Sequence, residues 1–145
     1  MLTPSDTYPA YTLAASMYEL LANPSSLETL RRELISAIPD ADTMPSFSQV
    51  EGFPYLNAVI QETVRLHPGV MARQARISPD VALTYAGKYV IPAGTITSMS
   101  PLTTHLSAAA FGPDAYAFRP QRWIDDPKIG RSFLGFARGA RNCVG

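Results

Sequence analysis

The stretch that decides the fold is residues 136–145, which read Phe-Ala-Arg-Gly-Ala-Arg-Asn-Cys-Val-Gly. It holds the only cysteine of the 145-residue chain, Cys143, with a glycine on either side of it at positions 139 and 145. Glycine permits tight turns and close approach of the backbone to a flat ligand. Residues 131–145 contain three arginines and no acidic residue, and nearby positive charge favours a thiolate over a thiol. A thiolate is the ligand that soft or borderline metals prefer, and an adjacent arginine can bind carboxylates with paired hydrogen bonds.

The pattern F-x-x-G-x-R-x-C-x-G resembles the haem-binding loop of the cytochrome P-450 family, the haem-thiolate monooxygenases. The resemblance implies that haem (iron protoporphyrin IX) is the cofactor, that Cys143 is the axial ligand of its iron, and that Arg141 contacts a haem propionate. Phe136 and Gly139 match packing positions of that loop. The family's usual glycine after the phenylalanine is replaced by Ala137. Without the family, the plainest interpretation is a buried structural cysteine in a basic loop.

Two further motifs lie before this loop. Glu62 and Arg65 form E-x-x-R in a stretch that predicts a helix, where side chains three residues apart lie on the same side and can pair. This motif resembles the family's K-helix signature. Residues 117–123 are similar to the family's P-E-R-F region, with Gln121 in place of the acid. The resemblance implies that Arg122 joins Glu62 and Arg65 in a buried network, because buried charges must be paired.

Three other residues take their roles from the resemblance alone. Arg76, just before the predicted hairpin, resembles a residue that contacts a haem propionate in many members. Asp6 and Thr7 match the acid–threonine pair that delivers protons to bound oxygen. Pro4 and Pro9 argue against that match, because each disfavours a helix at this place.

Three stretches carry apolar residues at helical spacing, and we expect helices at residues 11–21, 27–38 and 54–66. Ser25 and Glu28 have the S-x-x-E spacing of a capping box, which predicts the start of the second helix. Residues 1–9 are expected to be an irregular or disordered start.

Strand patterning follows the helices. Residues 75–99 predict a small sheet with a hairpin over residues 81–91. Residues 100–145 are expected to form an irregular meander and the haem-binding loop, with one short helix near residues 107–111. Helices followed by strands indicate a mainly α fold with a small β-sheet. The resemblance identifies residues 1–145 as a single partial domain, truncated at both ends: the end of the I helix, the J and K helices, the small sheet, the meander and the loop.

Composition excludes several other classes of protein. Twelve basic and twelve acidic residues leave no net charge, so no broad field attracts nucleic acid or anionic membranes. No run of 18 apolar residues is present, so we expect no membrane span. A single cysteine excludes an internal disulfide framework and a multi-cysteine zinc site.

The resemblance implies a haem-dependent monooxygenase that uses O2 to hydroxylate or epoxidise an apolar small molecule. Its electrons would come from an NADPH-dependent reductase, and the chain looks most like filamentous-fungal members that act in secondary metabolism. Intact relatives are typically anchored in the endoplasmic-reticulum membrane, and we expect no such anchor within this chain.

Two alternatives stay open on the residues alone. The chain could be a truncated, non-catalytic remnant that binds haem weakly or not at all, because Cys143 lies two residues from its end, where chains fray. Alternatively, Cys143 could be a nucleophile with His67 or His105 as its base. In either case we expect the helices of residues 11–66 to expose apolar faces.

Overall fold

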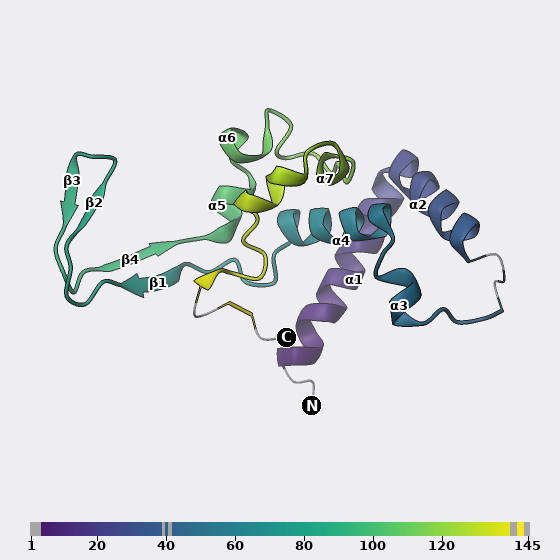
Figure 1. Cartoon of the computed structure of the whole chain (residues 1–145), viewed down its shortest axis with the longest axis horizontal. Coiled ribbons are helices and arrows are strands. Elements are labelled where there is room, and N and C mark those ends of the chain that lie inside the picture. Colours follow the sequence, from purple (N-terminus) through teal and green to yellow (C-terminus); the bar gives the residue numbers. More distant parts are fainter. Residues whose placement is uncertain (1–3, 39, 41, 140–141, 144–145) are drawn as a thin grey trace.

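The computed structural model describes residues 4–38, 40, 42–139 and 142–143, with side chains described from Thr7 onward. Three helices pack together at one end of the molecule, and four strands extend from the other end as a narrow arm (Figure 1). The helices are α1 (Pro4–Ala22), α2 (Pro24–Ala37) and α4 (Pro54–Leu66), and the single turn α3 (Phe47–Val50) lies between α2 and α4. The expectation of a mainly α fold with little sheet is confirmed.

The first helix differs from the sequence prediction. An irregular start was expected over residues 1–9, whereas α1 begins at Pro4 and continues through Pro9. Proline in the first turn costs nothing, because the N–H groups there have no helical partner. Pro9 lacks an N–H group and so removes one backbone hydrogen bond of the helix. The helix nevertheless continues through it, over 19 residues in all. Asp6 and Thr7 therefore lie on a helix.

The helical core is small and joins three elements. Leu20, Leu30, Tyr55 and Val59 are buried together where α1, α2 and α4 meet. The first turn of α4 is capped from α2, because the carboxylate of Glu33 accepts the amide N–H groups of Tyr55 and Leu56 at 2.8 Å each. A carboxylate at a helix N-terminus satisfies unpaired N–H groups and complements the helix dipole. This contact holds α4 against α2.

The start of α2 also differs from the prediction. The helix begins at Pro24 with Asn23 before it, so the predicted capping box of Ser25 and Glu28 lies inside the helix. Proline at the first helical position needs no N–H partner, which moves the start three residues earlier than apolar spacing suggests. A capping contact occurs instead at α3, where the Gln49 side chain accepts the amide of Ser46 at 2.7 Å.

The strands form two small antiparallel sheets in series rather than one. In the sheet nearer the helices, β1 (Gln74–Ile77) pairs with β4 (Ile96–Met99). At the tip, β2 (Leu83–Tyr85) pairs with β3 (Tyr89–Ile91) around a turn in which Ala86 and Gly87 have positive φ. The hairpin expected over residues 81–91 is this tip.

The segment after β4 is less irregular than expected. It contains α5 (Pro101–His105), α6 (Ala108–Phe111), α7 (Arg122–Asp125) and a 3₁₀ helix, η1 (Pro127–Ser132). Only α6 was expected, because helices of four or five residues are too short to show an apolar period. These short helices fold back over α4 (Figure 1).

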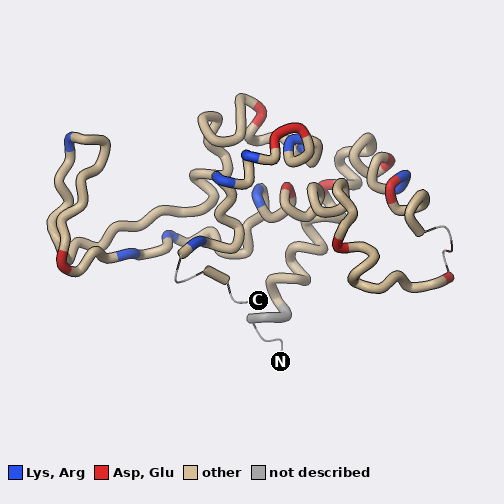
Figure 2. The backbone as a smooth tube through the Cα atoms, viewed as in Figure 1, with Lys and Arg blue, Asp and Glu red and all other residues tan. Residues whose placement is uncertain are grey.

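Apolar side chains are exposed on α1, as expected. Leu13, Met17, Tyr18 and Leu21 are each more than half exposed. Charges of both signs are spread along the chain, with neither sign covering one whole side (Figure 2). Within the described part of the chain, no helix combines the length and hydropathy needed to cross a bilayer.

Candidate functional site

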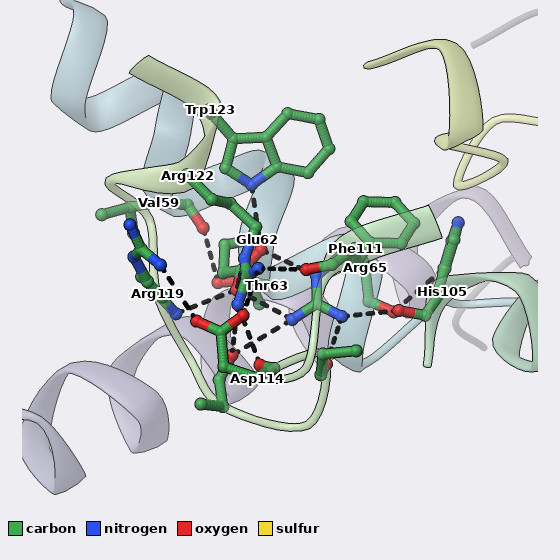
Figure 3. A network of polar contacts seen from close by, with 12 residues as sticks. Val59, Glu62, Thr63, Arg65, His105, Phe111, Asp114, Arg119, Arg122 and Trp123 are labelled. Carbon is green, nitrogen blue, oxygen red and sulfur yellow. Dashed lines mark hydrogen bonds and ion pairs between the residues drawn. The ribbon is translucent and has the colours of Figure 1, made fainter. Parts of the chain in front are cut away.

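A buried charge network joins α4 to the segment between α5 and η1 (Figure 3). At its centre is Glu62, whose side chain has no exposed surface. Its carboxylate accepts hydrogen bonds from two nitrogens of Arg65 at 2.8 Å each, from Nε of Arg122 at 3.0 Å and from Nε1 of Trp123 at 2.9 Å. The amide of Arg119 donates a further bond at 2.9 Å. The structure thus brings Glu62, Arg65 and Arg122 together.

The two arginines also bind backbone carbonyls of the segment that follows β4. Arg65 donates to the carbonyls of His105 at 2.7 Å and Ala115 at 2.6 Å, and its guanidinium carbon lies 5.0 Å from the centre of the Phe111 ring. Arg122 donates to the carbonyl of Phe111 at 2.7 Å. Among the described residues, no buried side-chain nitrogen or oxygen lacks a hydrogen-bond partner. The network therefore fixes this segment of short helices and turns onto α4.

His105, the last residue of α5, connects this network to the residues before the cysteine. Its ring is fully buried. Nδ1 lies 2.9 Å from the carbonyl oxygen of Arg65, and Nε2 accepts the amide of Leu134 at 2.9 Å. Burial lowers the pKa of His105 to about 4, so the imidazole is neutral near pH 7.

A row of aromatic rings also runs from the charge network toward the loop that carries the cysteine. Trp123 meets Phe133 edge-on at 5.2 Å between ring centres, and Phe133 meets Phe136 edge-on at 5.9 Å. Phe133 also stacks on His105 at 5.4 Å. Edge-on and offset pairs of this kind are favourable aromatic contacts. The rings extend the packing from the charge network to the loop that carries the cysteine.

A cavity of about 310 Å³ lies where α1, α4 and this loop meet. Tyr8 and Thr12 from α1 line it, with Val64 from α4 opposite. The loop contributes residues 134–137 and Cys143, so the only thiol of the chain lies on the wall of a mainly apolar cavity. Such a cavity suits a mostly apolar molecule that contains a metal ion able to bind the cysteine sulfur.

The loop has a backbone that few side chains permit. Gly139 has φ of +80° and Ala137 has φ of +57°, both in the left-handed region that favours glycine. At Gly135 an added Cβ would collide with the rings and methyls of Phe133 and Val64. The amide of Cys143 donates to the carbonyl of Phe136 at 2.9 Å, which closes the loop on itself.

Comparison with known proteins decides the family. The cytochrome P450 family model matches residues 6–145, nearly the whole chain. The chain belongs to the cytochrome P450 family. Its similarity extends to individual fungal members of known name.

Cytochrome P450 monooxygenase astB of Talaromyces wortmannii is 41% identical over 143 residues, which cover 94% of this chain and 28% of that relative. Cytochrome P450 monooxygenase TRI4 of Trichoderma arundinaceum is 39% identical over 138 residues, covering 92% of this chain and 26% of the relative. Pisatin demethylase of Fusarium vanettenii is 40% identical over 144 residues, covering 97% and 27%. The chain thus spans about a quarter of the length of the curated relatives it matches.

The remaining predicted P450 residues lie in different places. Phe136 and Cys143 line the cavity, and Gly139 lies in the loop between them. Arg76 is exposed on β1, where its guanidinium donates to the carbonyl of Ala75 at 2.8 Å. Gln74, two residues earlier on the same face of the strand, lines the cavity. Arg141 lies outside the described residues.

Asp6 and Thr7, the predicted acid–threonine pair, lie near the start of α1, beside the cavity-lining Tyr8. Thr7 precedes the cavity-lining Tyr8 on this helix, and the Asp6 side chain lies outside the described part of the chain. Tyr8 and Thr12 are one helical turn apart and were not expected to line the site. Their spacing is a signal in the sequence, but only the position of the loop opposite α1 shows that it faces a cavity.

The nucleophile alternative requires an imidazole base, and the structure places both histidines in other contacts. Both ring nitrogens of His105 are bound to backbone groups of Arg65 and Leu134. His67 lies 2.7 Å from the carboxylate of Glu19 on α1. The described residues contain no cluster of three or more His, Cys, Asp and Glu that could hold a metal ion. Cys143 therefore lacks an imidazole partner among the described residues.

Proposed function

We propose that this chain forms the thiolate side of the haem site of a monooxygenase, with Cys143 as the axial iron ligand. The observation that carries the proposal is the position of the only cysteine on the wall of a mainly apolar cavity, on a loop whose Leu134 amide is bound by His105 of α5. A mainly apolar wall with one sulfur ligand fits haem. The charge network supplies the fixed support that such a loop needs.

We assign to each predicted residue the role that the family resemblance implies. Cys143 binds the iron as thiolate, and Arg141 and Arg76 bind the propionates with charge-assisted hydrogen bonds. Phe136 and Gly139 give the loop its packing and its turn. Glu62, Arg65 and Arg122 position the loop and do not touch the ligand. Asp6 and Thr7, on the helix that lines the opposite wall, would move protons toward bound oxygen.

Haem bound here would supply activation of O2, while the protein supplies orientation and excludes water. The family resemblance implies an apolar small-molecule substrate that is hydroxylated or epoxidised. The electrons would come from an NADPH-dependent reductase, as the family implies. The fungal relatives, one of them named a pisatin demethylase, support a role in fungal secondary metabolism.

Haem titration of the 145-residue chain tests this proposal. We expect haem to bind in a 1:1 ratio and the reduced carbon monoxide complex to show the strongly red-shifted Soret band of thiolate ligation. Cys143→Ser should abolish that band. The matched control is Met44→Ser, which removes another sulfur at a residue that is 89% exposed. This control should leave the band unchanged.

Absence of specific haem binding by the folded chain would contradict the proposal and support the non-catalytic remnant. Binding with an unshifted band in both the natural chain and Cys143→Ser would show that another residue binds the iron. Substrate turnover requires a reductase and is a separate measurement.

A further inference from the structure

The described residues 134–139 together with Cys143 are called the cysteine loop. His105 lies where this loop meets the last turn of α4 and the end of α5. It is fully buried, and both of its ring nitrogens bind backbone groups of other segments. These partners are 40 and 29 residues away along the chain, at Arg65 and Leu134. A single side chain therefore joins the charge network to the loop.

The two partners determine the tautomer of the ring. The Arg65 carbonyl can only accept, so Nδ1 must carry the proton and donate to it at 2.9 Å. The Leu134 amide can only donate, so Nε2 must be the bare nitrogen that accepts it at 2.9 Å. No other tautomer satisfies both groups. Lysine, arginine or a protonated imidazole at this position could not make both bonds.

The ring is also held by its neighbours. Phe133 stacks on it at 5.4 Å with 14° between the planes, and Phe111 meets it edge-on at 5.9 Å and 86°. Leu134 is the first of four consecutive loop residues that line the cavity. Two residues after it, the carbonyl of Phe136 accepts the amide of Cys143 at 2.9 Å. The bond from His105 therefore anchors the loop where it enters the cavity wall.

We propose that His105 is a positioning residue that holds the entry of the cysteine loop against α4 and so determines where Cys143 presents its sulfur. The link between His105 and the loop follows from the geometry of the chain itself. Its consequence for haem ligation rests on the proposed function. His105 touches neither the cavity nor the cysteine, so its effect is transmitted through Leu134 and the loop backbone.

Two amide substitutions of different length test the two hydrogen bonds one at a time. In His105→Gln the terminal carbonyl oxygen reaches the place of Nε2 and can accept the Leu134 amide. In His105→Asn the shorter amide reaches only the place of Nδ1 and can donate to the Arg65 carbonyl. Both variants keep one buried hydrogen bond and differ in which segment they hold, so each is the control for the other.

Amide hydrogen exchange of the chain without haem tests the link. We expect His105→Asn to raise the exchange rate at Leu134 about tenfold, the effect of losing one hydrogen bond. His105→Gln should change this rate by less than about threefold. Equal exchange at Leu134 in the two variants would overturn the inference, as would a uniform rise across α4 and the loop in both. Such a uniform rise would show a general loss of stability rather than positioning.

The haem complex tests the consequence. We expect His105→Asn to lower the fraction of the reduced carbon monoxide complex with the red-shifted Soret band, while His105→Gln keeps it. A full red-shifted band in His105→Asn, together with raised exchange at Leu134, would overturn the claim that the link positions Cys143. If the natural chain binds no haem, the proposed function fails, whereas the exchange experiment still decides the link.

Discussion

The charge network and the cysteine loop are neighbours that hold their shapes in opposite ways. Glu62, Arg65 and Arg122 are nearly completely buried, and each makes several hydrogen bonds. Cys143 and Phe136 are exposed, and the described part of the loop is held mainly by backbone hydrogen bonds, with left-handed φ angles at Ala137 and Gly139. Rigidity is thus concentrated beside the candidate ligand site. The two regions meet at His105, which accepts the amide of Leu134.

The largest expected loss of stability comes from a substitution that removes one partner from the charge network. Arg65→Met leaves the Glu62 carboxylate buried without its main partner, and removal of one partner of a buried pair costs about 3–5 kcal/mol. Denaturant unfolding followed by circular dichroism measures this change. The control is Arg119→Ala, because Arg119 pairs with Asp114 and Asp125 through a side chain that is 50% exposed.

The control should cost less than about 1 kcal/mol, since exposed ion pairs contribute little. Its amide, which donates to Glu62, is unaffected by the substitution. Equal losses in the two variants would show that burial of the network does not distinguish it from the surface.

The second effect is a dependence of stability on pH at the junction between the two regions. Burial lowers the pKa of His105 to about 4 from 6.5, so the unfolded chain binds a proton between these values and the folded chain does not. The stability is therefore complete above about pH 6.5 and falls as the pH is lowered to about 4. The loss through this one group is about 3 kcal/mol.

Unfolding free energies measured across this pH range check the prediction. The groups that face the ring are the Arg65 guanidinium, whose charge also lowers the pKa, and the Glu62 carboxylate, whose charge opposes this. His105→Gln cannot take up the proton, so the slope between pH 6.5 and 4 should flatten. An unchanged slope would assign the pH dependence to other groups.

A smaller effect tests the contact between the loop and α4. Gly135→Ala puts a Cβ into Phe133 and Val64, and overpacking of this kind costs about 1–3 kcal/mol. At Gly52 an added Cβ meets nothing within 4 Å, so Gly52→Ala is the matched control and should change the unfolding free energy by less than about 0.5 kcal/mol. If Gly135→Ala is equally neutral, the loop does not pack on α4 as described.

The smallest effect concerns the loop's own strain. Ala137 has φ of +57°, so Ala137→Gly relieves a left-handed alanine and should stabilise the chain by up to about 1 kcal/mol. Ala14→Gly, on the exposed side of α1, should destabilise it by about 1 kcal/mol because glycine is a poor helix former. Thermal unfolding of the pair measures both. Destabilisation by both substitutions would show that Ala137 is not strained.

Short-range sequence patterns predicted much of the secondary structure. The E-x-x-R spacing places Glu62 and Arg65 on one side of α4, and apolar spacing predicted that helix at its observed bounds. The starts of α1 and α2 were missed, because proline at a first helical position reads as a breaker in the sequence. The short helices after β4 were missed because they span hardly more than one turn.

The site was predictable only where a motif names its residues. The motif pointed to Cys143, Phe136 and Gly139, and the structure adds the cavity that Cys143 and Phe136 share with Tyr8 and Thr12. Nothing in the sequence indicated that the two hydrogen-bond partners of His105 lie in α4 and in the cysteine loop. Hydrogen bonds between segments tens of residues apart leave no local pattern.

By itself, the sequence determined which residues can pair, turn or ligate, because helix periodicity, glycine conformation and thiolate chemistry depend on residue type and short spacing. Only the tertiary structure decided which backbone carbonyls Arg65 and Arg122 bind, that Ala137 takes a conformation suited to glycine, and that His105 has one tautomer. Burial and partner geometry come from packing of distant segments. Contacts with these distant segments hold the exposed loop, and with it the thiol of Cys143, in one place.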